Sequence, residues 1–307
     1  MPPIVSPMGR GRALARCALA GNPSDGYGGA VLSMTLANFQ AWAQASRAAR
    51  LRVEPASQLV EATVARFSRD VEPAAGSTRL GWRTSIPARV GLGGSSALVV
   101  ATLRALCDLY EVRLEAPALA EVAVAVEREE LGIVGGLQDQ FVQTHEGLLF
   151  IDFARPEVRA LDPGLLPPLL IGYRSASAQS SGLALLPLRR RYQQGEEAVL
   201  RGLTRLRSLA RQARDALLAG ERERFAQAVD GTFDGRREMM PLDPRHVAMV
   251  QRAREAGAAA NYTGSGGAVV CVCRDAGHRR AVSHALAADG CRTFVPRAAI
   301  PARSGGF

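Results

Sequence analysis

The sequence predicts an α+β protein built from two domains, and three observations support this class. Residues 16–153 alternate short apolar runs with segments of helical periodicity. Residues 188–239 have a charged, helical pattern, and a strand-helix-strand series follows them. A composition of 47% hydrophobic and 22% charged residues suits a globular chain with a buried core. We place the boundary near residue 155, between an N-terminal domain of residues 1–155 and a C-terminal domain of residues 156–307.

In the first half, strands and helices alternate between turn-forming loops. Residues 21–29 form the first loop, because Gly, Asn, Pro, Ser and Asp gather there. Short apolar runs predict strands, and the alternation in residues 30–53 is typical of paired strands. The predicted single strands are residues 16–19, 80–87 and 147–153.

Three helices are predicted in the same half. The first covers residues 56–67, and the second opens at Ser95 and carries one buried stripe. That stripe consists of Val99, Leu103, Leu106 and Tyr110. The third helix begins at Pro117, a favoured first-turn residue, and ends at Gly132.

The second half begins with a strand at residues 169–174 and continues into charged helices. The helical region of residues 188–239 is interrupted near Gly220, and a further helix follows at residues 246–256. The chain then closes with a strand, a helix and a strand, at residues 268–273, 277–288 and 293–295. This order predicts a small α+β sandwich.

The charge distribution excludes several classes of function. All 38 basic residues are arginine against 29 acidic residues, so the net charge is +9. A Walker A loop and a protein kinase each need a lysine, so both are excluded. A basic chain attracts anions such as nucleotides. Nucleic acid is not an expected partner, because the arginines are scattered and no series of aromatic residues accompanies them.

The cysteines and the hydropathy pattern predict a cytoplasmic protein. The five cysteines form no CxxC pair, which favours buried free thiols in a reducing compartment. No apolar stretch approaches the length of a membrane span, so no membrane association is expected.

The first chemical motif is a glycine-serine loop at the start of the second predicted helix. Its residues are Gly91, Gly93, Gly94, Ser95 and Ser96. Glycines let backbone N–H groups approach a phosphate closely, and the N-terminus of a helix favours negative charge. A serine hydroxyl there can also ligate Mg²⁺. The alternative is a plain helix cap, for which serine is equally suited.

The second motif places carboxylates around a glycine-rich turn. Glu127 lies on a predicted helix, and Asp139 follows the turn in an apolar setting. Such groups can deprotonate an alcohol or hold a metal ion. A solvated helix face for Glu127 and a helix cap for Asp139 are the alternatives.

The third motif is a glycine-rich turn that contains Gly264, Ser265 and Gly266 and leads into a strand. Its glycines permit close contact with a ligand, although a hairpin turn is the alternative. Val269 stands where the dinucleotide-binding fingerprint needs its last glycine, so that class is excluded. Ala97 likewise excludes a nucleophile elbow after Ser95.

Taken in order along the chain, the loop after Arg16, the glycine-serine loop and the last glycine-rich turn resemble the three motifs of the GHMP small-molecule kinases. The resemblance spans nearly the whole chain and is weakest over residues 156–243. It implies the two-domain GHMP kinase fold. In that fold the N-terminal domain is ribosomal S5 domain 2-like and binds ATP, and the C-terminal domain is ferredoxin-like.

Within the family, residues 19–27 and 130–139 are most similar to glucuronokinases. The resemblance implies an ATP-dependent enzyme that converts D-glucuronate to glucuronate 1-phosphate. Heptose or galactose kinases are the alternative, because heptose phosphate kinases carry a similar Gln-Asp stretch. A mevalonate-pathway kinase or decarboxylase and a non-catalytic sugar sensor are further alternatives.

The resemblance also implies the roles of individual residues. Asp139 corresponds to the catalytic aspartate and Arg16 to the basic residue beside it. Ser95 and Glu127 correspond to the Mg²⁺ ligands, while the whole glycine-serine loop wraps the ATP phosphates. The expected substrate-binding residues are Asn22, Asp25, Gly264, Ser265 and Gly266.

A sugar-acid substrate adds one requirement, because a buried carboxylate needs a paired cation. Arg174, early in the C-terminal domain, is the candidate, and a surface arginine at the end of a strand is the alternative. The expected partner is therefore a small sugar or sugar acid, bound by a monomer or a homodimer.

Overall fold

The first sheet is built around its two longest strands, β1 (Met8–Ala20) and β2 (Ala30–Arg47). The computed structural model describes residues 7–133, 135–155, 157–174 and 181–300. In it, β1 and β2 pair antiparallel, with Met8 opposite Ser46 at one end and Ala20 opposite Leu32 at the other. The other strands of this sheet are β3 (Arg52–Glu54), β4 (Thr78–Thr84), β5 (Leu148–Asp152) and β6 (Glu157–Leu161).

The expectation of paired strands within residues 30–53 is wrong in one respect. β2 is a single strand of 18 residues, and it pairs with β1, β4 and β5 instead of folding back on itself. The neighbours of β2 come from distant parts of the chain, so local alternation cannot identify them.

The first sheet continues past residue 155. β6 pairs antiparallel with β5, with Leu148 opposite Leu161 and Asp152 opposite Glu157. A domain boundary near residue 155 stays a prediction, and the change from one sheet to the other comes after Leu161.

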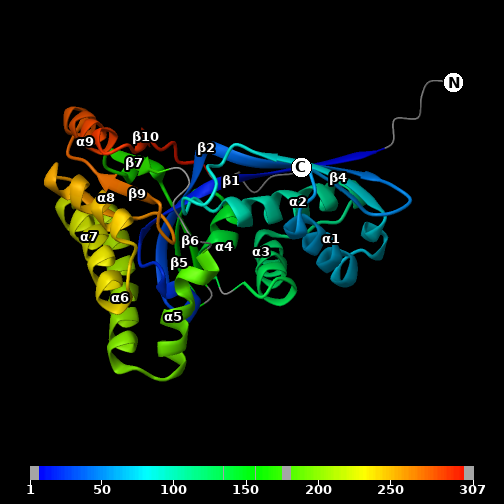
Figure 1. Ribbon diagram of the computed structural model, residues 1–307, viewed down its shortest axis with the longest axis horizontal. Coiled ribbons are helices and arrows are strands. Elements are labelled where there is room, and N and C mark those ends of the chain that lie inside the picture. Colours follow the sequence, from blue (N-terminus) through cyan, green and yellow to red (C-terminus); the bar gives the residue numbers. More distant parts are fainter. Residues whose placement is uncertain (1–6, 134, 156, 175–180, 301–307) are drawn as a thin grey trace.

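Four helices lie together beside the long strands of the first sheet (Figure 1). They are α1 (Gln58–Asp70), α2 (Gly94–Tyr110), α3 (Ala116–Ala125) and α4 (Gln138–His145). The predicted stripe on α2 is confirmed, since Val99, Leu103 and Leu106 expose no surface and Tyr110 is half-buried. Gly9 and Gly11 of β1 let α2 pack closely, because a Cβ at either position would collide with a carbonyl oxygen of this helix.

The second sheet has the order β10-β7-β9-β8 and is antiparallel throughout. Its strands are β7 (Leu169–Tyr173), β8 (Ala259–Tyr262), β9 (Ala268–Val272) and β10 (Arg292–Phe294). The predictions for β7, β9 and β10 hold to within a residue or two, whereas β8 was not expected as a separate strand. All five cysteines are free thiols, as expected.

The charged helical region is divided into three helices, α5 (Ser181–Gln193), α6 (Glu197–Ala219) and α7 (Arg222–Met239). The predicted break at Gly220 is confirmed, because this glycine ends α6 in the left-handed conformation. Two more helices, α8 (Pro244–Glu255) and α9 (Ala276–Ala288), accompany the second sheet.

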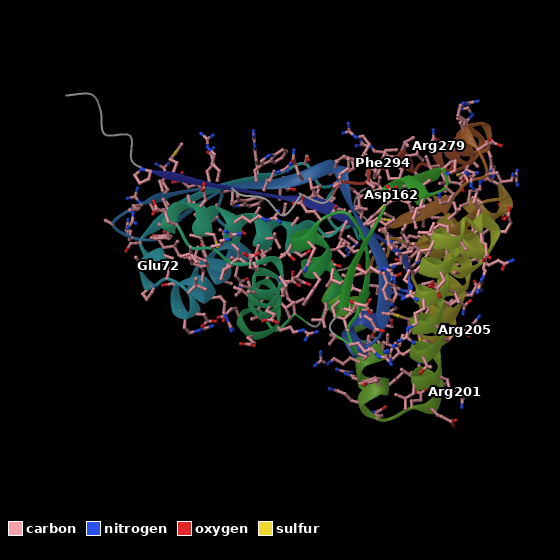
Figure 2. All side chains as sticks on the ribbon, turned by 180° about the vertical axis from the view of Figure 1, so that it is seen from behind. Glu72, Asp162, Arg201, Arg205, Arg279 and Phe294 are labelled. Carbon is pink, nitrogen blue, oxygen red and sulfur yellow. The ribbon has the colours of Figure 1, made fainter. Side chains whose placement is uncertain are left out.

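The molecule is elongated, with the two sheets toward different ends. Figure 1 shows β7, β9 and α9 at the end opposite α1, and Figure 2 shows Glu72 and Arg279 far apart on these two ends. Together, the two sheets confirm the predicted α+β class. Within the described ranges, no helix combines the length and the apolar character that a bilayer crossing needs.

Candidate active site

A cavity of about 600 Å³ gathers residues from both halves of the chain. The first half supplies the glycine-serine loop, Asp139 and the loop that holds Asn22 and Asp25. The second half supplies Leu185 and Leu186 of α5, Arg236 of α7 and the turn of Gly264 and Ser265. The loop after Arg16, the glycine-serine loop and the last glycine-rich turn therefore meet in one place, although more than 200 residues of chain separate Asp25 from Gly264.

The glycine-serine loop has the backbone geometry of a ligand-binding loop. Gly91 and Gly93 adopt φ angles of 73° and 72°, in the left-handed region that favours glycine. A Cβ on Gly91 would lie only 2.7 Å from the carbonyl oxygen of Gly266. α2 begins immediately afterwards at Gly94, so its free N–H groups and the positive end of its dipole face the cavity.

The two serines of this loop have different roles in the structure. Ser96 is buried, and its hydroxyl donates to the carbonyl oxygen of Gly93 at 3.2 Å. Ser95 is exposed where it lines the cavity. The hydroxyl of Ser96 therefore stabilises the loop, whereas that of Ser95 is accessible to a ligand.

Arg16 and Asp139 form a bidentate ion pair in the wall of the cavity. Arg16 Nε donates to Asp139 Oδ1 at 2.6 Å, and Arg16 Nη2 donates to Oδ2 at 2.7 Å. Burial lowers the pKa of Arg16, but the adjacent carboxylate of Asp139 raises it, and the net pKa lies above the ordinary value. The pair orients the carboxylate and holds a charged guanidinium beside it.

Arg16 also joins the other two motifs. Its Nη1 donates to the carbonyl oxygens of Gly91 and Thr263, at 2.6 and 2.7 Å. This one buried side chain therefore connects the carboxylate of Asp139, the glycine-serine loop and the start of the C-terminal glycine-rich turn.

Asp25 positions the helix that carries Asp139. Its Oδ2 accepts hydrogen bonds from the backbone N–H groups of Leu137 and Gln138, at 2.7 and 3.0 Å. It thus caps the N-terminus of α4 from a distant loop. Burial raises the pKa of Asp25 above its ordinary value, although these two N–H groups oppose the rise.

Asn22 links the same loop to the second sheet. Its Oδ1 accepts from Asn261 Nδ2 at 3.0 Å, and its Nδ2 donates to the carbonyl oxygen of Tyr262 at 3.4 Å. Asn22 and Asp25 both line the cavity while holding its walls together.

Glu127 is a buried carboxylate that lines the cavity. The helix expected to run to Gly132 changes after Ala125 into a π-helical turn, η3 (Val126–Glu130), which carries this residue. Burial raises the pKa of Glu127 to about 8, and the nearby charge of Asp139 adds to the rise. The described residues contain no cluster of three or more His, Cys, Asp or Glu side chains able to enclose a metal ion. A cation here would therefore take few protein ligands.

Comparisons with known proteins show the family to which the chain belongs. Residues 58–147 match the family model described as GHMP kinases N terminal domain. The chain is 32% identical over 306 residues to Glucuronokinase 1 of Arabidopsis thaliana, covering 85% of this chain and 84% of that protein. The chain belongs to the GHMP kinase family. It is therefore a phosphotransferase that acts on an alcohol group.

Two further relatives define how far the similarity extends. D-glycero-alpha-D-manno-heptose 7-phosphate kinase of Campylobacter jejuni is 43% identical over 70 residues, which cover 23% of this chain and 21% of that protein. The structure of Lactococcus lactis galactokinase complexed with galactose superposes with a TM-score of 0.78 at 16% identity, covering 95% of this chain and 93% of that one. The latter likeness shows that the GHMP kinase fold extends over both sheets.

The predicted substrate residues of this kinase do not all reach the cavity. Gly264 and Ser265 line it, whereas Gly266 lies behind them against Gly91. Arg174 is not among the lining residues, and its guanidinium donates to the carbonyl oxygen of Asp289. This hydrogen bond is typical of a residue that ties a strand end to the neighbouring loop.

Sequence reasoning missed Arg236, a buried arginine of this kinase that lines the cavity. A signal was present, because Arg236 follows Phe225, Val229 and Phe233 at helical spacing on the buried face of α7. An arginine in such a stripe needs a buried partner.

A second missed feature is an apolar part of the cavity wall. It comes entirely from the first half of the chain and is contributed by Leu59, Trp82, Ile86, Pro87 and Leu98. Trp82 is anchored there, since its Nε1 donates to the carbonyl oxygen of Pro55 at 2.8 Å.

Proposed function

We propose that this chain is an ATP- and Mg²⁺-dependent sugar kinase that converts D-glucuronate to glucuronate 1-phosphate. The observation that carries the proposal is the Arg16–Asp139 ion pair, which faces one cavity together with the glycine-serine loop. The similarity to a glucuronokinase over 85% of the chain supports the choice of substrate.

The glycine-serine loop is suited to the triphosphate of ATP. Unpaired backbone N–H groups at the start of α2, together with the helix dipole, stabilise phosphate oxygens. The apolar wall around Trp82 and Ile86 is suited to the flat, largely apolar face of a nucleobase. ATP therefore extends from this wall toward Asp139.

The transfer step uses Asp139 as the acceptor of a proton. As the anomeric hydroxyl oxygen of the sugar bonds to the γ-phosphorus, its proton moves to an oxygen of Asp139, and the bond to the β-phosphate oxygen breaks to release ADP. Each oxygen of Asp139 accepts one bond from Arg16 and keeps a second lone pair for the sugar hydroxyl. Arg16 adds a positive charge beside the reacting groups.

The residues near the phosphate loop fit Mg²⁺. Mg²⁺ usually takes one or two protein oxygens and completes its shell with phosphates and water. Glu127 offers a buried carboxylate whose burial an adjacent cation would compensate, and Ser95 offers an accessible hydroxyl. When bound, the ion would neutralise charge on the phosphates. Glu127 and Ser95 would hold it at the cavity wall.

A heptose phosphate is the second candidate acceptor. The similarity to the Campylobacter jejuni heptose 7-phosphate kinase is confined to 70 residues. It is nevertheless higher in identity than the similarity to the glucuronokinase, at 43% against 32%. Glucuronate remains the first choice of acceptor, because the similarity to the glucuronokinase covers 85% of the chain and so includes both sheets.

The test is to incubate the protein with Mg-ATP and one acceptor at a time, and to identify products by phosphorus NMR. The acceptors are glucuronate, galacturonate, galactose, a heptose 7-phosphate and mevalonate. We expect a new sugar phosphate whose phosphorus couples to the anomeric proton of glucuronate, formed at least about 100-fold more slowly by Asp139→Asn. Release of ADP without a phosphorylated acceptor, or preference for mevalonate, would contradict the proposal.

A further inference from the structure

Arg236 is a buried cation in the cavity wall that the transfer chemistry does not use. Its side chain is 1% exposed. Nη1 donates to the carbonyl oxygen of Gly264 at 2.6 Å, whereas Nε and Nη2 have no hydrogen-bond partner among the described residues. A buried guanidinium normally has a carboxylate or several carbonyl oxygens around it.

Two carboxylates of the cavity wall, Asp25 and Asp139, are already engaged elsewhere. Asp25 accepts two backbone N–H groups of α4, and Asp139 is bound on both oxygens by Arg16. What remains for Arg236 is the ring of Tyr262, whose centroid lies 5.2 Å from Cζ. Burial lowers the pKa of Arg236 to about 10, so the group is still charged at neutral pH.

An uncompensated buried charge is costly, and a ligand anion would offset that cost. Arg236 comes from the second half of the chain, and its hydrogen bond goes to the C-terminal glycine-rich turn beside Arg16. Asp25 and Arg16 both influence the charge of Arg236, whereas the glycine-serine loop makes no hydrogen bond to it among the described residues. These contacts put Arg236 near Arg16 and Asp25, away from the glycine-serine loop, so we place it on the acceptor side of the cavity.

We propose that Arg236 is a specificity-determining residue that binds an oxyanion of the acceptor through Nε and Nη2. This inference rests on the proposed function, since it assumes that the cavity holds a phosphate acceptor. A guanidinium matches a carboxylate bidentately, and the same fork accepts a phosphate group. Because the two nitrogens expose almost no surface, binding requires the Arg236 side chain to rotate toward the anion.

The experiment compares glucuronate with glucuronamide, its neutral analogue of nearly equal size. For the wild-type protein we expect kcat/KM to be about 100-fold higher with the acid, because a charge-assisted pair contributes about 1.5–3 kcal/mol and 1.4 kcal/mol corresponds to tenfold. In Arg236→Gln this preference falls to about fivefold or less through a higher KM for glucuronate, while the KM for ATP changes less than about twofold.

Two more variants make the test specific. Arg237→Gln removes the adjacent arginine, which is exposed on the same helix, and keeps wild-type kinetics. Arg236→Lys keeps a charge without the fork and regains part of the preference for the acid. Thermal shifts with each acceptor alone report binding without turnover. Glucuronate raises the Tm of the wild type and of Arg237→Gln but not that of Arg236→Gln.

The outcomes separate this inference from the proposed function. If the wild-type protein phosphorylates no sugar, the proposed function fails. If it phosphorylates glucuronate and glucuronamide equally well, only the assignment of Arg236 fails, and this comparison needs no variant. A rise in the KM for ATP with every acceptor would instead assign Arg236 to the nucleotide phosphates and overturn the proposal. Dependence on Arg236 with a heptose 7-phosphate would identify a phosphate as the oxyanion it binds.

Discussion

Replacing Asp139 by asparagine separates the proposed catalytic role of this residue from its structural one. In the wild-type protein both carboxylate oxygens accept from Arg16, at 2.6 and 2.7 Å. Asparagine keeps one acceptor oxygen and turns an NH₂ group toward the second donor of Arg16. The variant therefore loses one charge-assisted hydrogen bond and leaves a guanidinium that is 3% exposed without its counter-charge.

The expected loss of stability is moderate. A hydrogen bond to a charged group contributes about 1.5–3 kcal/mol. The lower part of that range applies, because the Asp139 side chain is 25% exposed and Nη1 of Arg16 keeps its two carbonyl acceptors. At about 2–4 °C per kcal/mol for a chain of this size, Tm falls by about 3–8 °C.

The expected loss of activity is far larger. An amide cannot accept the proton of the sugar hydroxyl, so kcat falls by about 10²–10⁴-fold. The affinity for ADP is expected to stay within about twofold of the wild-type value, because Asp139 does not belong to the glycine-serine loop that we propose to bind the phosphates. The assay combines initial rates of ADP release, calorimetric titration with ADP and thermal unfolding.

The Arg104–Glu146 pair provides a matched control. Its atoms are 2.8 Å apart, both side chains are largely buried, and neither residue lines the cavity. Glu146→Gln should lower Tm about as much as Asp139→Asn and leave kcat within about twofold. Retained turnover in Asp139→Asn with normal ADP binding would remove Asp139 from the role of base. An equal loss of turnover in Glu146→Gln would mean that instability alone explains the defect.

Two other predictions concern the surroundings of Asp139. Gly136→Ala inserts a Cβ that overlaps Asp25 Oδ2, so Asp25 can no longer cap α4 and kcat falls by about tenfold or more. The control is Gly26→Ala, whose Cβ meets only ordinary contacts and which keeps wild-type kinetics. Equal rates for the two variants would refute the capping role of Asp25. For Glu127, the folded-state pKa of about 8 exceeds the ordinary value of 4.5, so the folded protein binds this proton more tightly than the unfolded chain. The contribution of Glu127 to stability is therefore full below about pH 4.5 and is lost as the pH rises through 8. The Tm of nucleotide-free Glu127→Gln should exceed the wild-type Tm at pH 8.5 but not at pH 5. Tm curves that stay parallel over this pH range would contradict the raised pKa of Glu127.

Much of the fold follows from local patterns that survive into the tertiary structure. The apolar stripe of α2 and the stop of α6 at Gly220 depend on helical periodicity and on the left-handed preference of glycine. Such signals act within a few residues. The partners of β2 lie far along the chain, and local alternation therefore misassigned this strand as a pair.

In the candidate site, too, the features that depend on neighbouring residues were predictable from the sequence, whereas those that depend on distant contacts were not. The residues of the glycine-serine loop are recognisable in the sequence because backbone conformation and helix capping act locally. Asp25 caps a helix more than 100 residues away, and no spacing in the sequence indicates this contact. The burial of Arg236 was indicated by its place in the apolar stripe of α7, but only the packing shows that Arg236 lines the cavity whereas Arg174 donates to the carbonyl oxygen of Asp289.

Amino-acid order alone thus determined the class of fold, the three glycine-rich motifs and the residue types available for chemistry, because each depends on neighbours within one or two turns of chain. Folding decided which of these residues meet. Arg16 contacts Asp139, Gly91 and Thr263 only because the two sheets bring distant loops together around one buried guanidinium. Burial also shields the side chains of Arg236, Asp25 and Glu127 from water, so that each of these charges needs a hydrogen-bonding or oppositely charged partner.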